Sequence, residues 1–416
     1  MRIHPYLDLL RRNPAFARLY AAELVSFGGD WFATVALLGL ALQLTGSSAI
    51  ASFVLVLQVG PFFLASPLAG VLADRLDRRR LMVTADVARA VIALGFLLAR
   101  DPATLWIALL AAGGVSGLSA FFEPTSSAAL PNLVDEADLP TANVLIGSAW
   151  GTMLAIGAAM GGIIAATMGR DAAFVLDAAS FAISAWLIVG IRRSFGGASA
   201  DTDTRATRVG FRSALVETWA LARGSRRISA LLLAKATFGV GSGAIFLLAL
   251  FGSSVFGGGD IGIGILFAAR GLGALIGPFL ARAVVSLDDP GTFLGIGASF
   301  VVFVSAYLLL PLAPGIAVAA VLVFAGHLGG GAQWMLSSLG LQRAVPDAIR
   351  GRVFSVDYAL VTLAVAVSTL LAGAVASAAG PTVALYALMI PAACAALAWL
   401  IWTRSMRRAD RATLPE

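Results

Sequence analysis

The sequence predicts an all-α polytopic membrane protein, with twelve transmembrane helices in two pseudo-symmetric halves of six. Hydrophobic residues occupy 59% of the 416 positions before the 45 glycines are counted, and charged residues occupy only 12%. Because a soluble protein needs a largely polar exterior, this composition excludes the soluble globular and disordered classes. The apolar residues also gather in runs that are long enough to cross a bilayer, which takes about 20 helical residues.

Six apolar runs precede the one long polar stretch of the chain. They cover residues 18–43, 48–72, 81–99, 103–126, 141–168 and 171–191. Turn-forming segments separate several of them, at 45–48, 100–102 and 169–171. The first run is too long for a signal peptide and contains Glu23 and Asp30, so we expect it to be the first transmembrane helix.

Six further runs follow the polar stretch. They cover residues 229–252, 261–283, 292–312, 315–338, 353–379 and 382–402. Glycine- and proline-rich breaks at 257–260, 313–315 and 380–381 separate three pairs of them. The second half therefore has the same predicted number of helices as the first.

The polar stretch divides the chain. We expect an amino-terminal half at 1–191, a cytoplasmic linker at 192–228, a carboxy-terminal half at 229–402 and a basic cytoplasmic tail at 403–416. The second part of the linker, from Phe211 to Ala222, could form an amphipathic helix on the membrane surface.

A faint repeat relates the two halves. Gly70 and Arg75 correspond to Gly277 and Arg282 at an offset of 207, and Ser126 corresponds to Ser337 at an offset of 211. Repeated halves around a site at the membrane midplane are typical of secondary transporters.

The basic residues predict the orientation. Twenty-four of the 29 lie in segments that share one side of the membrane, only Arg100 and Arg170 lie on the other, and three lie inside spans. Since basic loops stay in the cytoplasm, we expect both termini there. A composition rich in Ala, Gly and Arg suggests a bacterial genome, hence the bacterial plasma (inner) membrane. The net charge of +6 then reflects topology, and we expect no nucleic-acid partner.

Several kinds of site are excluded by composition. Cys394 is the only cysteine, so no intrachain disulfide can form, and two histidines cannot build a His/Cys metal cluster. Lys235, the only lysine, follows Leu-Leu-Leu-Ala and cannot end a phosphate-binding loop. We therefore expect no enzyme, no metal and no cofactor.

One loop motif resembles a known family. The chain reads Gly70-Val71-Leu72-Ala73-Asp74-Arg75 and continues to Arg78-Arg79-Arg80. This resembles the cytoplasmic Gly-x-Leu-Ala-Asp-Arg signature of the major facilitator superfamily. The resemblance implies that fold and a conformational latch, in which the acid and the arginines form breakable ion pairs and Gly70 lets two helices approach. Glu123 and Asp357 could pair with the arginines at 78–80, which could instead only fix the topology.

Further segments narrow the resemblance. They are Phe27-Gly28-Gly29-Asp30-Trp31, Leu130-Pro131-Asn132-Leu133-Val134, Gln342 to Asp347 and Arg350 to Phe354. They look like the macrolide-efflux and enterobactin-exporter branch of drug:proton antiporters. The stretch 157–162 resembles a glycine-rich antiporter motif, although it is equally a helix-packing motif.

Two positions depart from the pattern. The fourth helix lacks the family's arginine and reads Leu-Leu-Ala-Ala-Gly-Gly at 109–114, and Ala281 replaces the counterpart of Asp74. The proton route therefore need not follow that of the better-known exporters.

Charged side chains inside spans are candidate functional residues, because burial in hydrocarbon is costly. Asp30, Arg270 and His327 lie near the midpoints of their helices, and Glu23 and Lys235 lie closer to the cytoplasm. We expect Glu23 and Lys235 to pair as an inner gate. Asp30, with Arg270 or His327, would form the polar core of the transport path.

Asp30 is the expected proton carrier, since a carboxyl group in a partly dry cavity could exchange protons near neutral pH. Static salt bridges, and a hydrogen-bonded packing role for His327, are the alternatives. Asp86 and Arg89, three residues apart, can neutralise each other. The sequence suggests no specific function for Asp177.

The resemblance also implies a central cavity lined mainly by helices 1, 4, 7 and 10. The side chains expected there are Trp31, Phe121, Phe122, Phe238, Phe246, Gln333 and Trp334, with Gln58 from helix 2. Aromatic walls suit bulky amphipathic ligands, although a lipid-facing or packing position is the commoner case for any one aromatic.

These observations predict a secondary transporter that exports a small amphipathic compound (a drug, macrolide or siderophore) by proton antiport and alternating access. Its expected partners are the substrate, protons and membrane lipids, and we expect a monomer. A lysophospholipid flippase of the same fold and a transport-dead membrane receptor or scaffold are the alternatives.

Overall fold

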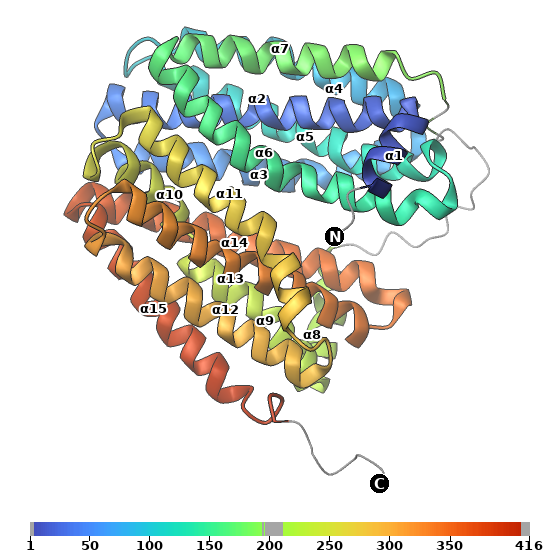
Figure 1. Cartoon of the computed structure of the whole chain (residues 1–416), viewed down its shortest axis with the longest axis vertical. Coiled ribbons are helices and arrows are strands. Elements are labelled where there is room, and N and C mark those ends of the chain that lie inside the picture. The colour runs from blue at the N-terminus through green and yellow to red at the C-terminus, as the bar shows by residue number, and fades with distance from the viewer. Residues whose placement is uncertain (1–3, 194, 196–210, 409–416) are drawn as a thin grey trace. The chain divides into compact units, whose positions relative to one another are not determined.

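The computed structural model describes residues 4–193, 195 and 211–408 (Figure 1). The predicted linker and tail therefore lie partly outside the described residues. Within these ranges the chain forms helices and no strand. Contacts divide it into two compact units, Met1–Asp203 with Leu248–Ala268, and Thr204–Leu247 with Ala269–Glu416.

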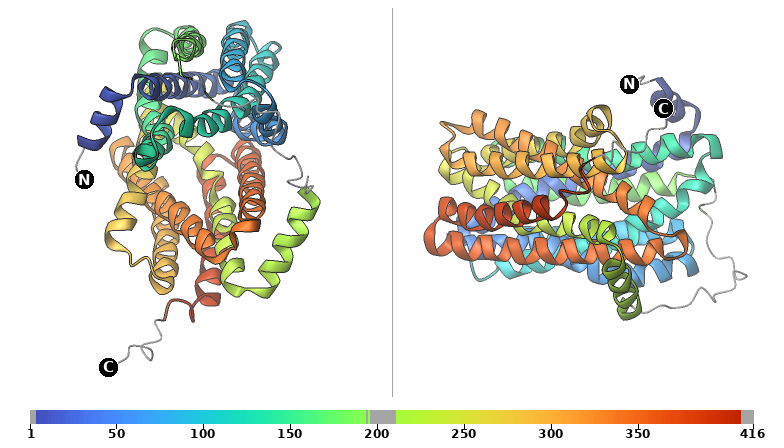
Figure 2. Two further views of the ribbon diagram at one scale, coloured as in Figure 1. Left: turned by 90° about the vertical axis from the view of Figure 1, so that its right-hand side faces the viewer. Right: turned by 90° about the horizontal axis from the view of Figure 1, so that it is seen from below.

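The first unit is a bundle of long helices that run alongside one another (Figures 1 and 2). Its elements are α1 (His4–Arg12), α2 (Pro14–Thr45), α3 (Ser48–Arg75), α4 (Arg78–Ala93), the 3₁₀ turn η1 (Leu94–Leu98), α5 (Leu105–Leu133), η2 (Glu136–Asp138), α6 (Leu139–Thr167) and α7 (Arg170–Val189). Helix α2 packs on α6 and α7, α3 packs on α5, and α4 packs on α5 and α7.

The remaining helices follow along the chain, and most of them belong to the second unit. They are α8 (Phe211–Gly224), α9 (Arg226–Gly241), α10 (Ala244–Leu250), the π-helical turn η3 (Phe251–Val255), α11 (Gly259–Val284), α12 (Asp289–Leu309), η4 (Leu310–Leu312), α13 (Ile316–Ala344), α14 (Asp347–Ala379) and α15 (Pro381–Trp402). Helices α10 and α11 contribute residues to both units, and η3 belongs to the first.

Twelve helical segments of the described chain are long and apolar enough to cross a membrane. They are Pro14–Thr45, Ser48–Ser66, Arg78–Leu98, Leu105–Leu133, Thr141–Thr167, Arg170–Val189, Arg226–Val255, Gly259–Val284, Asp289–Leu312, Ile316–Ala344, Val356–Ala379 and Pro381–Trp402. The predicted all-α fold with twelve spans is confirmed, and most boundaries lie within a few residues of the predicted ones.

Local chemistry explains where the spans begin and end. The Asn13 side chain accepts a hydrogen bond from the Phe16 amide at 3.0 Å, and Pro14 occupies the first position of α2. At the other end Gly46 adopts φ 61°, the left-handed conformation that ends helices. The predicted turn at 45–48 is thus a helix stop followed by the Ser47 cap of α3.

Glycines bring the helices of the first unit together. A Cβ atom on Gly157 would lie 3.1 Å from Cβ of Trp31, and one on Gly161 would lie 2.9 Å from Cα of Phe32. Helix α6 therefore rests directly on the main chain of α2. This contact favours the packing interpretation of the glycine-rich stretch at 157–162.

The segment Leu248–Ala268 packs within the first unit. Arg170 donates from Nε and Nη2 to the two carboxylate oxygens of Asp260, at 3.0 and 3.1 Å, and from Nη1 to the amide oxygen of Gln43. A Cβ atom on Gly162 would lie 3.1 Å from Cα of Gly264. An ion pair and a backbone contact thus hold the start of α11.

Candidate functional site

A cavity of about 150 Å³ lies inside the first unit, among α2, α3, α5, α6 and α7. Its lining combines carboxylates, neutral polar groups and aromatic rings. The lining residues are Phe27, Asp30, Trp31, Ala33, Thr34, Leu37, Val54, Gln58, Phe62, Phe96, Ala112, Val115, Ser116, Ser119, Glu123, Trp150 and Asp177. Three residues predicted from the sequence, Asp30, Trp31 and Gln58, are among them.

Three carboxyl groups from three helices line this Asp30 cavity. Asp30 comes from α2, Glu123 from α5 and Asp177 from α7. Asp177 is only 1% exposed, and neither of its carboxylate oxygens has a hydrogen-bond partner among the described residues. A Cβ atom on Gly29 would lie 2.9 Å from Oδ1 of Asp177. Glycine therefore lets this carboxylate lie against α2, beside Asp30.

The basic group that acts on all three carboxylates is Arg89 of α4. Arg89 forms a buried ion pair with Asp86 and donates to the hydroxyl of Ser119 at 3.2 Å. Its guanidinium lies 4.9 Å from the ring centre of Phe122 and 4.5 Å from that of Phe181. The expected Asp86–Arg89 pair is confirmed, and it leaves the cavity with more negative than positive charge.

Neutral polar groups connect the cavity walls. The amide of Gln58 donates to the hydroxyl of Thr34, which donates to the main-chain oxygen of Asp30 at 2.6 Å. Ser116 donates to the main-chain oxygen of Gln58 at 2.7 Å. These bonds tie α3 and α5 to the part of α2 that carries Asp30.

The aromatic wall only partly matches the expectation. Trp31 faces Trp150, with ring centres 6.3 Å apart, and Phe267 at 5.9 Å. The other two aromatics predicted for this wall do not line the cavity: Phe122 packs in a core cluster beneath Arg89, and Phe121 is half-buried elsewhere on α5. The sequence could not tell which face of α5 turns inward, because the helix is apolar all round.

The two residues expected to form the inner gate, Glu23 and Lys235, each contact a residue of their own unit. Glu23, buried on α2, accepts a hydrogen bond from the hydroxyl of Ser126 on α5. Lys235, buried on α9, forms an ion pair with Asp357 on α14. Each group finds a partner inside its own unit, and the pairing of Glu23 with Lys235 as a gate stays a prediction.

Lys235 is the centre of a small buried cluster in the second unit. Its Nζ lies 4.9 Å from the ring centre of Trp334 and 5.6 Å from that of Phe354. Asp357 is 1% exposed, so this ion pair is screened from solvent.

The remaining polar candidates of the second unit lie on or near α13. Nε2 of His327 is 2.8 Å from the hydroxyl of Tyr307, and Arg270 acts electrostatically on both. This hydrogen bond agrees with the packing interpretation of His327. Gln333 is 1% exposed, with no hydrogen-bond partner for its amide among the described residues.

The two other predicted aromatics of this unit are packing residues. The ring of Phe238 packs against that of Phe303 at a tilt of 48°, with ring centres 4.7 Å apart, and Phe246 is fully buried. A transport path shared by Asp30 with Arg270 or His327 stays a prediction.

The predicted latch has different contacts from those expected. Arg78 donates to the main-chain oxygens of Ala128 at 2.9 Å and Phe195 at 3.3 Å, Arg79 donates to that of Val189, and Arg80 is exposed. Glu123 instead lines the Asp30 cavity, and Asp357 forms an ion pair with Lys235 in the second unit. A contact of Asp357 with these arginines stays a prediction. The side chains of Asp74 and Arg75, and the surroundings of Gly70, lie outside what the structure describes.

Sequence reasoning missed Asp177, Ser126 and Tyr307 as partners. Asp177 carried one usable signal, an acid inside a span, but nothing in the sequence located it beside Asp30. Among the described residues, no group of three or more His, Cys, Asp or Glu side chains is arranged to hold a metal ion. The arrangement of the three carboxylates suits the binding of protons or of an organic cation.

Comparison with known proteins gives a match over nearly the whole chain. A family model described as a transmembrane secretion effector matches residues 9–414. BacE of Bacillus subtilis, a candidate bacilysin exporter, is 28% identical over 367 residues, which are 86% of this chain and 88% of BacE. The multidrug efflux pump Tap of Mycolicibacterium fortuitum is 30% identical over 199 residues, which are 45% of this chain and 47% of Tap.

Solved structures share the fold. A bacterial homologue of the human lysosomal transporter Spinster, in an inward-facing conformation, aligns with a TM-score of 0.73 and 17% identity over 96% of this chain and 98% of that one. A POT family transporter aligns with a TM-score of 0.74 and 13% identity, covering 94% and 96%. At these identities the likeness concerns the fold alone.

Proposed function

Because this chain belongs to the transmembrane secretion effector family of the major facilitator superfamily, we propose that it is a secondary active transporter. It exports a small amphipathic compound, such as a drug, macrolide or siderophore, in exchange for protons. Relatives named as an exporter and as a multidrug efflux pump support export. The proposal includes outward transport, coupling to protons and an amphipathic substrate.

The observation that carries the proposal is the charge balance of the Asp30 cavity. Three carboxyl groups share a space of about 150 Å³, and the arginine that acts on them already pairs with Asp86. Like charges held together in a membrane interior cannot all remain ionised, so protons or a cationic group must neutralise part of them. A site that either protons or substrate can neutralise couples the two by competition.

The rest of the cavity suits an amphipathic ligand. Trp31 and Trp150 offer apolar faces that can also hold a cation, and Gln58 offers amide hydrogen bonds. The free volume is small for a macrolide, so a large substrate would need the two units to move. Alternating access supplies such a movement.

Localisation and assembly are part of the same proposal. The chain is a multi-pass membrane protein, and the asymmetry of its arginines supports a bacterial plasma membrane with both termini in the cytoplasm. We infer a monomer that needs no cofactor and draws on the proton gradient.

The test is accumulation of dyes and macrolides in efflux-deficient bacteria that express the full chain. We expect wild type to lower accumulation, and a protonophore to abolish the effect. Asp30→Asn and Asp177→Asn should also abolish it, since both remove a proton-binding group from the cavity. Membrane expression of every variant is matched by quantitative blotting.

Asp171→Asn is the control. Asp171 belongs to an exposed ion pair with Arg100 at 2.7 Å, away from the cavity, so its loss should leave export intact. Export that survives both cavity substitutions would refute the coupling role. If the whole panel behaves like the empty vector, export of these compounds is contradicted, and siderophore and lysophospholipid flux become the next assays. A chain that moves none of them would be a receptor or scaffold.

A further inference from the structure

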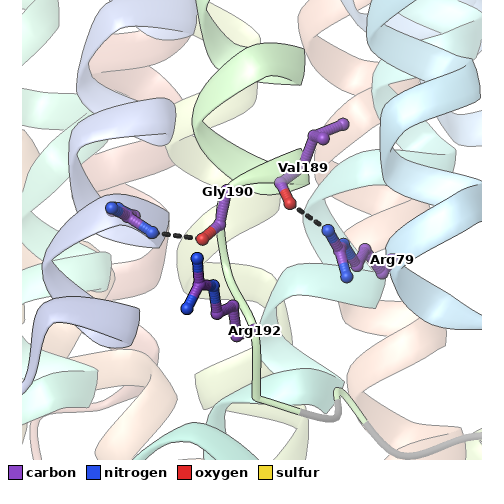
Figure 3. A pocket seen from close by; sticks show the side chains of 5 residues that line it. Arg79, Val189, Gly190 and Arg192 are labelled. Atoms are coloured by element: carbon purple, nitrogen blue, oxygen red, sulfur yellow. Dashed lines mark hydrogen bonds between the residues drawn. The ribbon is translucent and has the colours of Figure 1, made fainter.

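A second, larger pocket lies at the carboxy-terminal end of α7. It has a volume of about 740 Å³ and is lined by Arg18, Arg79, Val189, Gly190 and Arg192. Figure 3 shows the guanidinium of Arg79 turned toward the oxygen of Val189, with that of Arg192 close to Gly190. Three helices meet here, because Arg18 comes from α2, Arg79 from the start of α4 and Arg192 from just beyond α7.

Two of the arginines are held in place by the end of α7. Arg18 donates to the main-chain oxygen of Gly190, and Arg79 donates to that of Val189. The last carbonyls of a helix carry partial negative charge, which favours these contacts. Each guanidinium has five N–H donors, so each keeps donors for a further ligand. Prior immobilisation lowers the entropy cost of binding one.

The pocket has a strong excess of positive charge. Among the described residues, its lining contains three arginines and no carboxylate. Among the described acids, Asp77 caps the start of α4 through the Arg80 amide, and Asp138 pairs with Arg12. Asp135 lines a neighbouring pocket that shares Arg18 and Arg192. An anion with several oxygens would satisfy the remaining arginine donors.

The surface next to the pocket is apolar and exposed. On α7, Ile183, Trp186 and Val189 are 46%, 71% and 51% exposed. Their spacing of three residues places them along one side of the helix. Val189 also lines the pocket, so the apolar strip leads directly into the arginine cluster. A free phosphate would use only the arginines, whereas a lipid would use both surfaces.

We propose that this pocket binds the headgroup phosphate of an anionic phospholipid, whose acyl chains lie along the Ile183–Trp186–Val189 strip. Basic pockets between helices at a membrane face are suited to such headgroups. The bound lipid would bridge α2, α4 and the segment that follows α7, which supply the three arginines.

The test is a lipid titration of the purified full-length protein in detergent, with bound lipid counted by native mass spectrometry. Phosphatidylglycerol and phosphatidylcholine are the probes. For Arg18→Gln/Arg79→Gln/Arg192→Gln, we expect phosphatidylglycerol binding to weaken about tenfold or more. Phosphatidylcholine binding should be unchanged. Arg192→Gln alone keeps both carbonyl bonds at the end of α7 and should weaken binding about threefold, which protects the test if the triple variant fails to fold.

The matched control is Arg11→Gln/Arg404→Gln/Arg408→Gln, which removes the same charge from exposed arginines outside the pocket. It should keep wild-type affinity for phosphatidylglycerol. Equal losses in pocket and control variants would show attraction by net charge alone and overturn the proposal. Unchanged binding in the pocket variants would overturn it too. Competition by inorganic phosphate as effective as that by the lipid would mark a soluble-anion site instead.

Discussion

Gly29 determines how closely the carboxylate of Asp177 approaches α2. A Cβ atom at this position would lie 2.1 Å from Oγ of Ser180 and 2.9 Å from Oδ1 of Asp177. We expect Gly29→Ala to push α7 away from α2 and to lower the free energy of unfolding by about 1–3 kcal/mol. Thermal unfolding in detergent, followed by size-exclusion chromatography, measures the loss.

The neighbouring glycine is a matched control for this prediction. A Cβ atom on Gly28 would have Sδ of Met153 as its nearest neighbour, at 3.6 Å, an ordinary van der Waals distance. Gly28→Ala should therefore leave the melting temperature close to that of wild type. Equal effects of the two substitutions would contradict the packing argument.

The buried Asp86–Arg89 ion pair should contribute to the stability of the first unit. Both side chains are almost fully buried, so Arg89→Met leaves the Asp86 carboxylate without its cation. We expect this variant to lose about 3–5 kcal/mol of stability, since an uncompensated buried charge costs more than a missing pair. Asp86→Leu/Arg89→Met should recover most of the loss. A double variant no more stable than Arg89→Met would show that the unpaired Asp86 carboxylate is not the cause of the lost stability.

At the scale of helices, the sequence predicted most of what the structure contains. Runs of apolar residues locate the twelve spans, because a bilayer sets the length of a helix and leaves few alternatives. The breaks at Gly46, Gly169 and Gly380 were predictable too, because glycine favours the positive φ that ends a helix. All three glycines adopt a positive φ in the structure. Local chemistry decides these features, so they can be inferred without tertiary contacts.

Side-chain partners were not predictable in the same way. An apolar helix gives no sign of which face turns inward, so Phe122 was expected in the cavity wall and packs beneath Arg89 instead. Glu123 was expected among the arginines at 78–80 and lies in the Asp30 cavity. The rotation of each helix comes from its packing, which a single sequence does not report.

The start of α11 is the element whose attachment is most open to test. Asp260 accepts from Arg170 at 3.0 Å and lies so close to α2 that a Cβ atom on Gly39 would be 2.0 Å from its Oδ1. We expect Asp260→Ala to loosen the segment 252–264 from the first unit. Faster backbone hydrogen exchange in that segment, measured by mass spectrometry, would report the loosening.

A comparable aspartate provides the control for this exchange experiment. Asp289 forms an ion pair with Arg227, and both side chains are substantially exposed. Asp289→Ala should not alter exchange in 252–264. Unchanged exchange in the Asp260 variant would mean that the backbone contact between Gly162 and Gly264 holds the segment by itself.

For the whole molecule, the internal repeat explains why a gate pair was expected between the two halves. Glu23 and Lys235 occupy equivalent positions of the two halves, at an offset of 212. In the first unit Glu23 binds Ser126, and in the second Lys235 binds Asp357. Because the two side chains have opposite charges at equivalent positions, we expected them to form one ion pair between the two halves. Each group finds one partner in its own unit, while the second carboxylate oxygen of Glu23 is buried without a hydrogen-bond partner among the described residues.

The Lys235–Asp357 ion pair could serve stability alone or transport as well, and an experiment can separate the two roles. Lys235→Met leaves a buried carboxylate without its partner and should destabilise the protein by about 3–5 kcal/mol. Lys235→Met/Asp357→Leu should restore stability, because matched apolar residues can replace a buried ion pair. We nevertheless expect the double variant to lose export, since ionisable groups inside a membrane usually serve function. Thermal unfolding and drug accumulation, measured on the same variants, separate the two roles. A stable double variant that exports like wild type would make the pair a structural bridge.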